Sequence, residues 1–328
     1  MLRTLCYKKD GTIRTDIPLD EVKVLLEEGD TTLWMDFEAT LPEQDEPILT
    51  HVFNFHPLAV EDALQQSNVP KLDDWDDYLY IVLHTVVFEQ EFAGILDTPE
   101  LDIFLGKNYM VTHHDHKVPP LDRVWEYILR DPRHVKNGAD RVLWRLMEEV
   151  VTSYMPVIEE MDDAIDKTED EVFANPSPRT LERIFSLKRA ALHLRRVIGP
   201  QREVLNRLAR DDFAVIDPRT RVYFRDVYDH LVRMHDITES IRDLVGGALD
   251  TYLSVINNRM NDIMKTLTVI TTLFMPIAFI TGFFGMNFFV AIPPYSSWTE
   301  QPVFILMLSL MVIIPFSMLM WIRRKGWM

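Results

Sequence analysis

The chain has 328 residues, with 51 Asp and Glu against 34 Lys and Arg, so that its formal net charge is −17. This acidic balance argues against nucleic acid as a partner, because phosphates attract Lys and Arg. Cys6 is the only cysteine, which excludes an intrachain disulfide and with it a disulfide-stabilised secreted scaffold.

The first third of the chain carries alternating strand and helix patterns. Runs rich in aromatic and β-branched residues predict strands, and Gly106-Lys107-Asn108 predicts a hairpin turn of the Gly/Asn type. The predicted strands are Thr31–Phe37, Tyr78–Phe88, Leu101–Leu105 and Tyr109–Thr112, and the predicted helices are Leu19–Glu28 and His56–Gln65. Residues 1–139 are therefore expected to form a mixed α+β domain in the cytoplasm.

Two clusters near these strands could be taken for metal sites. His113, His114 and His116 offer zinc ligands, but adjacent histidines on a strand point to opposite faces, so at most part of the cluster can converge. We expect a solvated strand end there. The acidic run Asp73–Asp77 lacks the glycine and the terminal glutamate of a Ca²⁺ loop, and it is expected to form a solvated turn.

From about Pro119 onward, long helical patterns replace the strands, with breaks at Asn175–Pro178 and at Asp217-Pro218. The first pattern, Asp140–Ala174, ends strongly acidic, and the second, Arg179–Asp212, is the most basic part of the chain. Opposite charges favour an antiparallel helical hairpin over residues 140–217, although both helices could equally present solvated charged faces.

The third helical pattern begins after Pro218 and meets no proline until Pro276. Apolar residues recur in it at steps of three and four, as in an amphipathic helix. They are Leu231, Met234, Ile237, Ile241, Leu244, Ala248, Tyr252 and Val255. We expect residues 218–266 to form a stalk helix that continues without a break into the apolar segment beyond it.

Two uncharged stretches follow, because no charged residue lies between Lys265 and Glu300 or from Gln301 to Ile322. Residues 267–286 and 303–322 each reach the length of about 20 residues that a helix needs to cross the hydrocarbon core of a bilayer. We therefore expect two helices that span a lipid membrane, joined by a short external loop at 287–302.

The basic residues nearest the spans predict their orientation. Arg259 and Lys265 precede the first span, and Arg323, Arg324 and Lys325 follow the second, whereas the loop has neither Lys nor Arg. The positive-inside rule then places both termini in the cytoplasm. We expect a protein of the cell (inner) membrane that ends in a basic cytoplasmic tail at 323–328.

One face of the first span and of the stalk before it carries small, polar or thioether side chains. Read at steps of three and four, this stripe consists of Asn261, Met264, Thr268, Thr271, Met275, Ala278 and Gly282. It suits either a pore wall or a close contact between helices. Two helices cannot enclose a water-filled path, so a pore would require a ring of identical subunits, with one such helix from each subunit facing the axis.

The tripeptide Gly285-Met286-Asn287 stands at the outer end of the first span, and the arrangement around it resembles the CorA family of magnesium transporters. Further matches at Met275-Pro276, Val222–His230 and His56-Pro57-Leu58 extend the resemblance over essentially the whole chain. It implies a homopentameric, funnel-shaped channel. Such a channel would carry Mg²⁺, and also Co²⁺ and Ni²⁺, down the membrane potential, with negative feedback from cytoplasmic Mg²⁺.

The same resemblance implies which residues function. Gly285, Met286 and Asn287 would form a selectivity filter, where neutral oxygens hold a hydrated ion. The implied pore-lining residues are Asp250, Asn261, Met264, Leu267, Thr268, Met275, Ala278 and Gly282. Relatives often carry a hydroxyl at the position of Ala278. Regulatory Mg²⁺ would bind between subunits, to Asp226 of the stalk and to Glu89 or Glu91 of the funnel domain.

Two other functions compete with this one. A zinc transporter of the ZntB branch would typically carry Gly-Ile-Asn in place of the tripeptide, so Met286 counts against it. A membrane-anchored enzyme or sensor would not need an unbroken stalk, and the sequence contains no nucleophile motif, no zinc-protease signature and no Gly-rich phosphate loop. We therefore expect no enzymatic activity.

Overall fold

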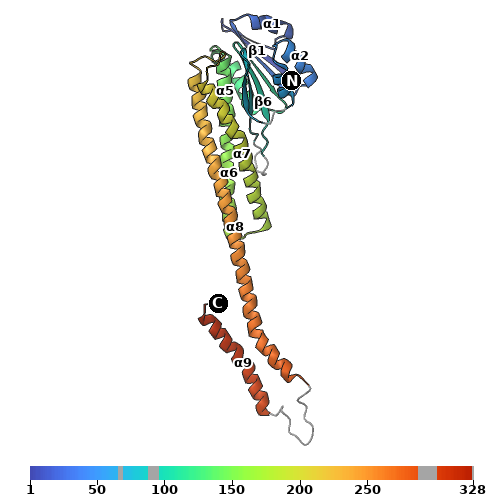
Figure 1. The fold of residues 1–328 in the computed structure, drawn as a ribbon, viewed down its shortest axis with the longest axis vertical. Coiled ribbons are helices and arrows are strands. Elements are labelled where there is room, and N and C mark those ends of the chain that lie inside the picture. The colour runs from blue at the N-terminus through green and yellow to red at the C-terminus, as the bar shows by residue number, and fades with distance from the viewer. Residues whose placement is uncertain (66–68, 88–95, 287–300, 327–328) are drawn as a thin grey trace. The chain divides into compact units, whose positions relative to one another are not determined.

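Seven strands form one sheet in the N-terminal part of the chain (Figure 1), in the order β2-β1-β3-β7-β6-β5-β4. Their bounds are β1 Leu2–Lys8, β2 Ile13–Thr15, β3 Thr31–Glu38, β4 Lys71–Asp74, β5 Tyr78–His84, β6 Glu100–Gly106 and β7 Tyr109–His114. Neighbours pair antiparallel except β3 and β7, which pair in parallel. All residues of β5 and β6 are buried, because helices cover both faces of the sheet.

The computed structural model describes residues 1–65, 69–87, 96–286 and 301–326. The chain divides into an N-terminal unit, Met1–Asp250, and a C-terminal unit, Thr251–Met328. The α-helices are α1 Leu19–Glu27, α2 Pro42–His51, α3 Pro57–Gln65, α4 Pro119–Arg130, α5 Ala139–Thr152, α6 Tyr154–Ala174, α7 Pro178–Arg210, α8 Arg221–Phe284 and α9 Gln301–Arg324. The sheet and α1 to α7 belong to the N-terminal unit, and α8 passes from one unit into the other.

The main apolar core lies between one face of the sheet and α1, α2 and α3. Leu33, Met35 and Phe37 of β3 point into this core, at the period of two that a strand imposes. The residues between them face the opposite side, where α4, α5 and α7 pack. The ring of Trp34, for example, lies 4.8 Å from the ring of Trp125 in α4, centroid to centroid.

The turn between β6 and β7 confirms the predicted hairpin, with Leu105 paired to Met110. The ring of Tyr109 lies against Gly106, where a Cβ atom would come within 2.2 Å of a ring carbon, so the turn requires glycine at this point. The predicted strand Tyr78–Phe88 is too long, because β5 ends at His84 and Phe88 lies outside the described residues.

The predicted helix Asp140–Ala174 is wrong in one respect, because it consists of two helices, α5 and α6, that meet at Ser153. Pro156 lies in the first turn of α6 and has no N–H with which to bond the carbonyl of Thr152. At the junction, the hydroxyl of Ser153 donates to the carbonyl of Val150 at 2.6 Å. Pro156 therefore leaves the carbonyl of Thr152, the last residue of α5, without its regular helical hydrogen bond, and the helix is interrupted there.

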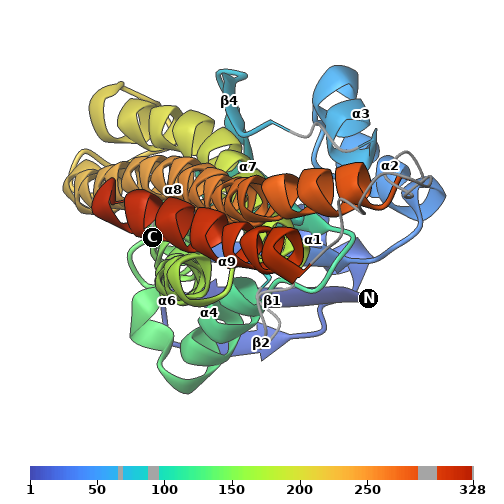
Figure 2. The same cartoon turned by 90° about the horizontal axis from the view of Figure 1, so that it is seen from below.

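Helices α6, α7 and the first part of α8 run side by side (Figures 1 and 2). A capping box between Ser177 and Thr180 starts α7. The two helices of the predicted hairpin bury apolar side chains, while their opposite charges contribute an ion pair of 2.6 Å between Arg183 and Glu171. Most of the acidic side chains of α6 are exposed to solvent. The charges therefore both pair across the hairpin and form a solvated surface.

Helix α8 runs for 64 residues and contains Pro276. Its buried side chains in the N-terminal unit recur at steps of three and four, apart from one gap of seven: Phe224, Val227, Leu231, Thr238, Ile241, Val245 and Ala248. Two of the predicted apolar positions lie off this line, since Ile237 is 37 % and Leu244 is 46 % exposed. Compared with the predicted orientation, the helix is rotated about its axis so that Thr238 and Val245 are buried in place of Ile237 and Leu244.

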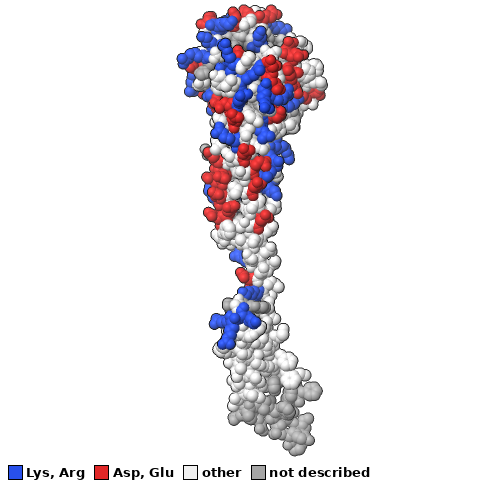
Figure 3. Space-filling model, turned by 60° about the vertical axis from the view of Figure 1, so that its left-hand side comes forward, with Lys and Arg blue, Asp and Glu red and all other residues white. Residues whose placement is uncertain are grey.

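Two described helices are long and apolar enough to cross a membrane, at Arg221–Phe283 and Ile305–Arg324. Their most apolar segments reach mean hydropathies of 1.8 and 2.4, and only 6 % of each segment is buried. Figure 3 shows the same contrast, with charged side chains over the N-terminal unit and few of them over the apolar helices. Apolar surface of this extent requires a cover, either of lipid or of other helices.

Candidate ion pathway and regulatory residues

The eight predicted pore-lining residues all lie on α8 and are exposed. Most of them follow one face of the helix, because the steps from Asn261 to Met264, Thr268, Met275, Ala278 and Gly282 are three, four or seven residues. The apolar members are 57 to 64 % exposed: Met264, Leu267 and Met275. Helix α8 therefore provides a continuous stripe that no other described segment of the chain covers.

The hydroxyls of Thr268 and Thr271 in α8 can accept hydrogen bonds, because each uses its own hydrogen within the helix. Thr268 donates its hydroxyl hydrogen to the Met264 carbonyl at 2.8 Å, and Thr271 donates to the Leu267 carbonyl at 2.9 Å. Each hydroxyl oxygen then keeps its lone pairs free for a donor outside the helix. A cation with its hydration shell presents such donors, because its bound waters point their hydrogens outward.

Helix α8 ends at the predicted filter. The Gly285 N–H donates to the Thr281 carbonyl at 2.9 Å, and the Met286 N–H donates to the Phe283 carbonyl at 3.3 Å. A Cβ atom at position 285 would lie 2.9 Å from the Thr281 carbonyl oxygen, so the helix end requires glycine there. Met286 is 51 % exposed, and Asn287 lies outside the described residues.

The predicted regulatory residue Asp226 is exposed in the second turn of α8, and none of the described cations pairs with it. Its expected partners, Glu89 and Glu91, lie outside the described residues. Asp229, three residues further along the helix, is also exposed and shares a face with Asp226. Among the described residues no group of three His, Cys, Asp or Glu is arranged to hold a metal ion.

The expectation of a solvated strand end at the histidine cluster is wrong. His113 and His114 are 3 % and 1 % exposed, because β7 lies inside the sheet between two layers of helices. They do face opposite sides: Nε2 of His113 lies 3.4 Å from Oδ2 of Asp45, and Nε2 of His114 lies 3.3 Å from Oδ1 of Asp36. Each ring is therefore buried beside a carboxylate, and only His116 of the three is exposed.

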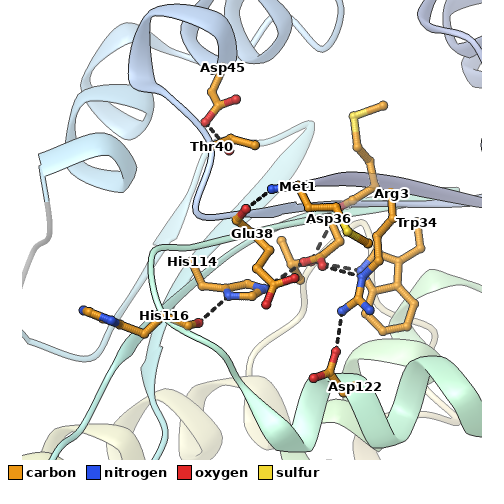
Figure 4. A network of polar contacts seen from close by, with 12 residues as sticks. Met1, Arg3, Trp34, Asp36, Glu38, Thr40, Asp45, His114, His116 and Asp122 are labelled. Atoms are coloured by element: carbon orange, nitrogen blue, oxygen red, sulfur yellow. Dashed lines mark hydrogen bonds and ion pairs between the residues drawn. The ribbon is translucent and has the colours of Figure 1, made fainter.

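Asp36 is the centre of the buried network in Figure 4. It accepts hydrogen bonds from Nε of Arg3, at 2.7 Å, and from the hydroxyl of Thr112. Burial alone would raise the pKa of Asp36, but the bonds and charge of His114, together with Thr112 and Arg3, hold it below its usual value. A second Arg3 nitrogen, Nη2, donates to Asp122 at 2.9 Å, so the arginine links β1 to α4.

The surroundings of His114 favour its charged form. Its Nδ1 lies 2.6 Å from the carbonyl oxygen of His116, and its Nε2 faces the Asp36 carboxylate. Both neighbours carry negative charge or partial charge, so both favour the positively charged imidazolium. Burial lowers the pKa of His114, but the hydrogen bond and charge of Asp36 outweigh burial and raise it above the usual 6.5.

Protein stability should therefore fall as the pH rises through the raised pKa of His114, because its contribution is complete only below 6.5. At the acid end the sign is reversed, because the depressed pKa of Asp36 makes its contribution complete above 3.8 and lost as the pH falls through the lowered pKa. We expect His114→Asn to lower the free energy of unfolding by roughly 3 kcal/mol at pH 6 and to remove this alkaline decline. Unfolding midpoints of the full-length protein between pH 5.5 and 9 provide the measurement, and parallel profiles for both proteins would contradict the assignment.

A second group of buried polar side chains lies on β5 and β6 and comprises Tyr80, His84, Glu100 and Asp102. The sequence offered a signal for it, because Glu100 and Asp102 alternate with apolar residues along β6. The hydroxyl of Tyr80 donates to Oδ1 of Asp102 at 2.6 Å. Burial raises the pKa of Asp102 well above its usual value, which favours the neutral acid, and burial lowers the pKa of His84 to about 4. Asp102 and His84 are therefore both favoured in their neutral forms.

Known proteins resemble this chain over its whole length. The sequence model of the family described as CorA-like Mg²⁺ transporter protein matches residues 29–324. YfjQ of Bacillus subtilis, named as a metal ion transporter, is 35 % identical over 329 residues, which are 100 % of this chain and 98 % of YfjQ. The cobalt/magnesium transport protein CorA of Thermotoga maritima is 34 % identical over 344 residues, covering 99 % of this chain and 96 % of that protein.

The fold also matches a solved structure. The complete CorA magnesium transporter of Methanocaldococcus jannaschii superposes with a TM-score of 0.82 at 24 % sequence identity. The match covers 99 % of this chain and 98 % of the solved one, so the sheet domain, the long helix and the C-terminal apolar helix recur together.

Proposed function

Since this chain belongs to the CorA-like Mg²⁺ transporter family, we propose that it conducts Mg²⁺ into the cytoplasm through a membrane channel made of five identical copies. The observation that carries the proposal is the exposed stripe on α8, which has no cover within the described part of the chain. Cobalt stands beside magnesium in the name of the Thermotoga relative, and we include Co²⁺ and Ni²⁺ as further cargo.

A ring of subunits explains the exposure of the stripe. Two membrane helices per chain cannot surround water, whereas several copies of α8 can surround an axis. The side chains of Met264, Leu267 and Met275 would then converge and form an apolar constriction that closes by losing its water. An added Cβ atom at Gly282 would lie more than 4 Å from other described residues, which is consistent with a position that faces an axis or a neighbouring copy.

The proposed path handles the ion with neutral oxygens. Mg²⁺ gives up its water reluctantly, so a filter that reads the hydrated ion avoids most of the dehydration cost. Asn287, with its backbone and its side-chain amide, would provide such a ring at the outer mouth, and Thr268 would provide another further in. Weak binding at each ring permits release, which conduction requires. Ala278 offers no oxygen, so this chain would have one ring fewer than relatives with a hydroxyl there.

The membrane potential would drive the ion inward. With both termini in the cytoplasm, the filter faces outside, and an inside-negative potential attracts cations through the pore. Each elementary charge gains about 2.3 kcal/mol per 100 mV, and a divalent ion gains about twice that. Passive uptake therefore needs no coupled reaction.

Cytoplasmic Mg²⁺ would close the channel from within. Of the net charge of −17, the residues after Thr266 contribute +2, so the first 266 residues carry −19 and copies in a ring repel one another. Mg²⁺ held between Asp226 of one copy and Glu89 or Glu91 of the next would offset this repulsion. Loss of internal Mg²⁺ would then loosen the ring and widen the constriction on α8.

The ring can be tested by cysteine crosslinking at two adjacent positions of α8. Met275 belongs to the stripe and Phe274 does not, although they are 64 % and 65 % exposed. In a Cys6→Ser background we expect Met275→Cys to form disulfide-linked copies under oxidation and Phe274→Cys to form far fewer. Native mass spectrometry of the detergent-solubilised protein should give five times the chain mass of 38.5 kDa. A mass of one copy, or equal crosslinking at both positions, would contradict the proposal.

A further inference from the structure

A pocket of about 410 Å³ lies where α7 ends and α8 begins. It is lined by Ala209, Arg210, Arg221, Val222 and Arg225, so three of its five lining residues are arginines and none is acidic. The pocket therefore extends the basic character of α7 to the first turns of α8, in a chain that is acidic as a whole. All five residues belong to the N-terminal unit, so the pocket is complete within one folded part of the chain.

The guanidinium groups of the pocket are only partly paired. Arg221 forms an ion pair with Asp212, yet its Nε atom is buried and makes no hydrogen bond to the described residues. Arg210 and Arg225 form no ion pair with any described carboxylate. Because the Nε atom of Arg221 is buried, the donors open to an acceptor in the pocket include those of Arg210 and Arg225, whose side chains are exposed.

The helix dipoles explain only one of the three arginines. Arg210 lies in the last turn of α7, where a cation is favourable because that end carries partial negative charge. Arg221 lies in the first turn of α8, where the partial positive charge makes a cation unfavourable, and Arg225 follows in the second turn. Two arginines therefore occupy positions that raise the local potential, and an anion would offset both them and the dipole.

We propose that this pocket binds a polyphosphate anion, of the kind carried by a nucleoside triphosphate, in its metal-free form. Arginine forks match phosphate oxygens in pairs, and three of them offer enough donors for two or three phosphate groups. The volume exceeds that of a single phosphate and lies within the usual range of small-molecule sites. A bound Mg²⁺ would remove two negative charges and would find no carboxylate in the lining, so the metal complex should bind more weakly.

The site also suggests how a polyphosphate could act on the channel, and this step rests on the proposed function. Arg225 is the neighbour of Asp226, the proposed ligand of regulatory Mg²⁺. When cytoplasmic Mg²⁺ falls, more of the cell's polyphosphate is free of metal. Its binding beside Asp226 would neutralise Arg225 and add negative charge, which strengthens repulsion between copies and favours the open ring.

Calorimetric titration of the full-length protein in detergent with ATP, in EDTA, tests the site. We expect saturable binding that weakens about 10-fold or more in the double variant Arg210→Gln/Arg225→Gln, because two arginine–phosphate contacts are lost. The matched control Arg196→Gln/Arg233→Gln removes two exposed arginines from the same two helices, outside the pocket, and should bind as the wild type does. Inorganic tripolyphosphate should replace ATP, and ATP saturated with Mg²⁺ should bind at least about 10-fold more weakly.

Three results would overturn the proposal: no saturable binding to the wild type, equal weakening by both double variants, or equal affinity for ATP with and without Mg²⁺. Unfolding midpoints and native masses of the variants show whether they fold and assemble. Failure here leaves the proposed transport function intact, because the wild type would still conduct Mg²⁺ in reconstituted vesicles. Absence of Mg²⁺ conduction together with metal-free ATP binding would instead remove the transport function and leave the site.

Discussion

Mg²⁺ uptake should fall about 100-fold or more when Asn287 is replaced by alanine, while assembly is unchanged. In the proposed ring the substitution removes one amide from each of five copies. A hydrogen bond contributes about 0.5 to 1.5 kcal/mol net, so five lost contacts with the hydrated ion amount to several kcal/mol. The α8 end itself should survive, because its requirement for glycine lies at Gly285. Initial rates of Mg²⁺ entry into proteoliposomes measure the effect.

Two further variants separate the amide from general damage to the membrane part. Asn287→Gln keeps the amide on a longer side chain and should retain part of the uptake. Ser309→Ala removes a hydroxyl of α9 that donates to its own helix, at the Ile305 carbonyl, and should leave uptake unchanged. Wild-type rates in Asn287→Ala, with equal amounts of assembled protein, would remove Asn287 from the filter.

The second large effect is expected for inhibition by internal Mg²⁺. Asp226→Ala should raise the internal Mg²⁺ concentration for half-inhibition by about 10-fold or more, because the proposed site between copies loses a carboxylate. The exposed position of Asp226, without a described cation partner, leaves its carboxylate available to an ion. Uptake into vesicles preloaded with graded Mg²⁺ measures the shift.

Asp229→Ala is the matched control, since it removes the same charge one helical turn away on a residue that is also exposed. If the effect of Asp226 were only the general repulsion of an acidic ring, both substitutions would shift inhibition equally. A specific ligand predicts a large shift for Asp226→Ala and a small one for Asp229→Ala. Unchanged inhibition in Asp226→Ala would place the sensor elsewhere.

Local patterns predicted much of the fold because they depend on neighbouring residues. The hairpin follows from the turn residues Gly106-Lys107-Asn108, and the long α8 follows from the absence of proline between Pro218 and Pro276. Where local and tertiary preferences differ, the predictions were less accurate. The buried line of α8 passes through Thr238 and Val245, because packing sets the rotation of the helix.

The buried histidines show what a single sequence does not reveal. His113 and His114 look like a polar strand end, and their partners Asp45 and Asp36 are about 70 to 80 residues away in the chain. Only the fold brings these pairs together. The candidate site has the same limit in a stronger form, because a pore made by several copies and a metal ion held between them depend on contacts that no single chain contains.

The central claim is that the protein conducts Mg²⁺ down the membrane potential, and Mg²⁺ influx into proteoliposomes with an entrapped Mg²⁺-sensitive dye tests it most directly. An inside-negative potential should start rapid entry, abolition of the potential should slow it, and a proton gradient alone should have no effect. Co²⁺ and Ni²⁺ should compete with Mg²⁺. Zinc entry driven by protons, without a Mg²⁺ signal, would contradict the account and assign the protein to zinc transport despite Met286.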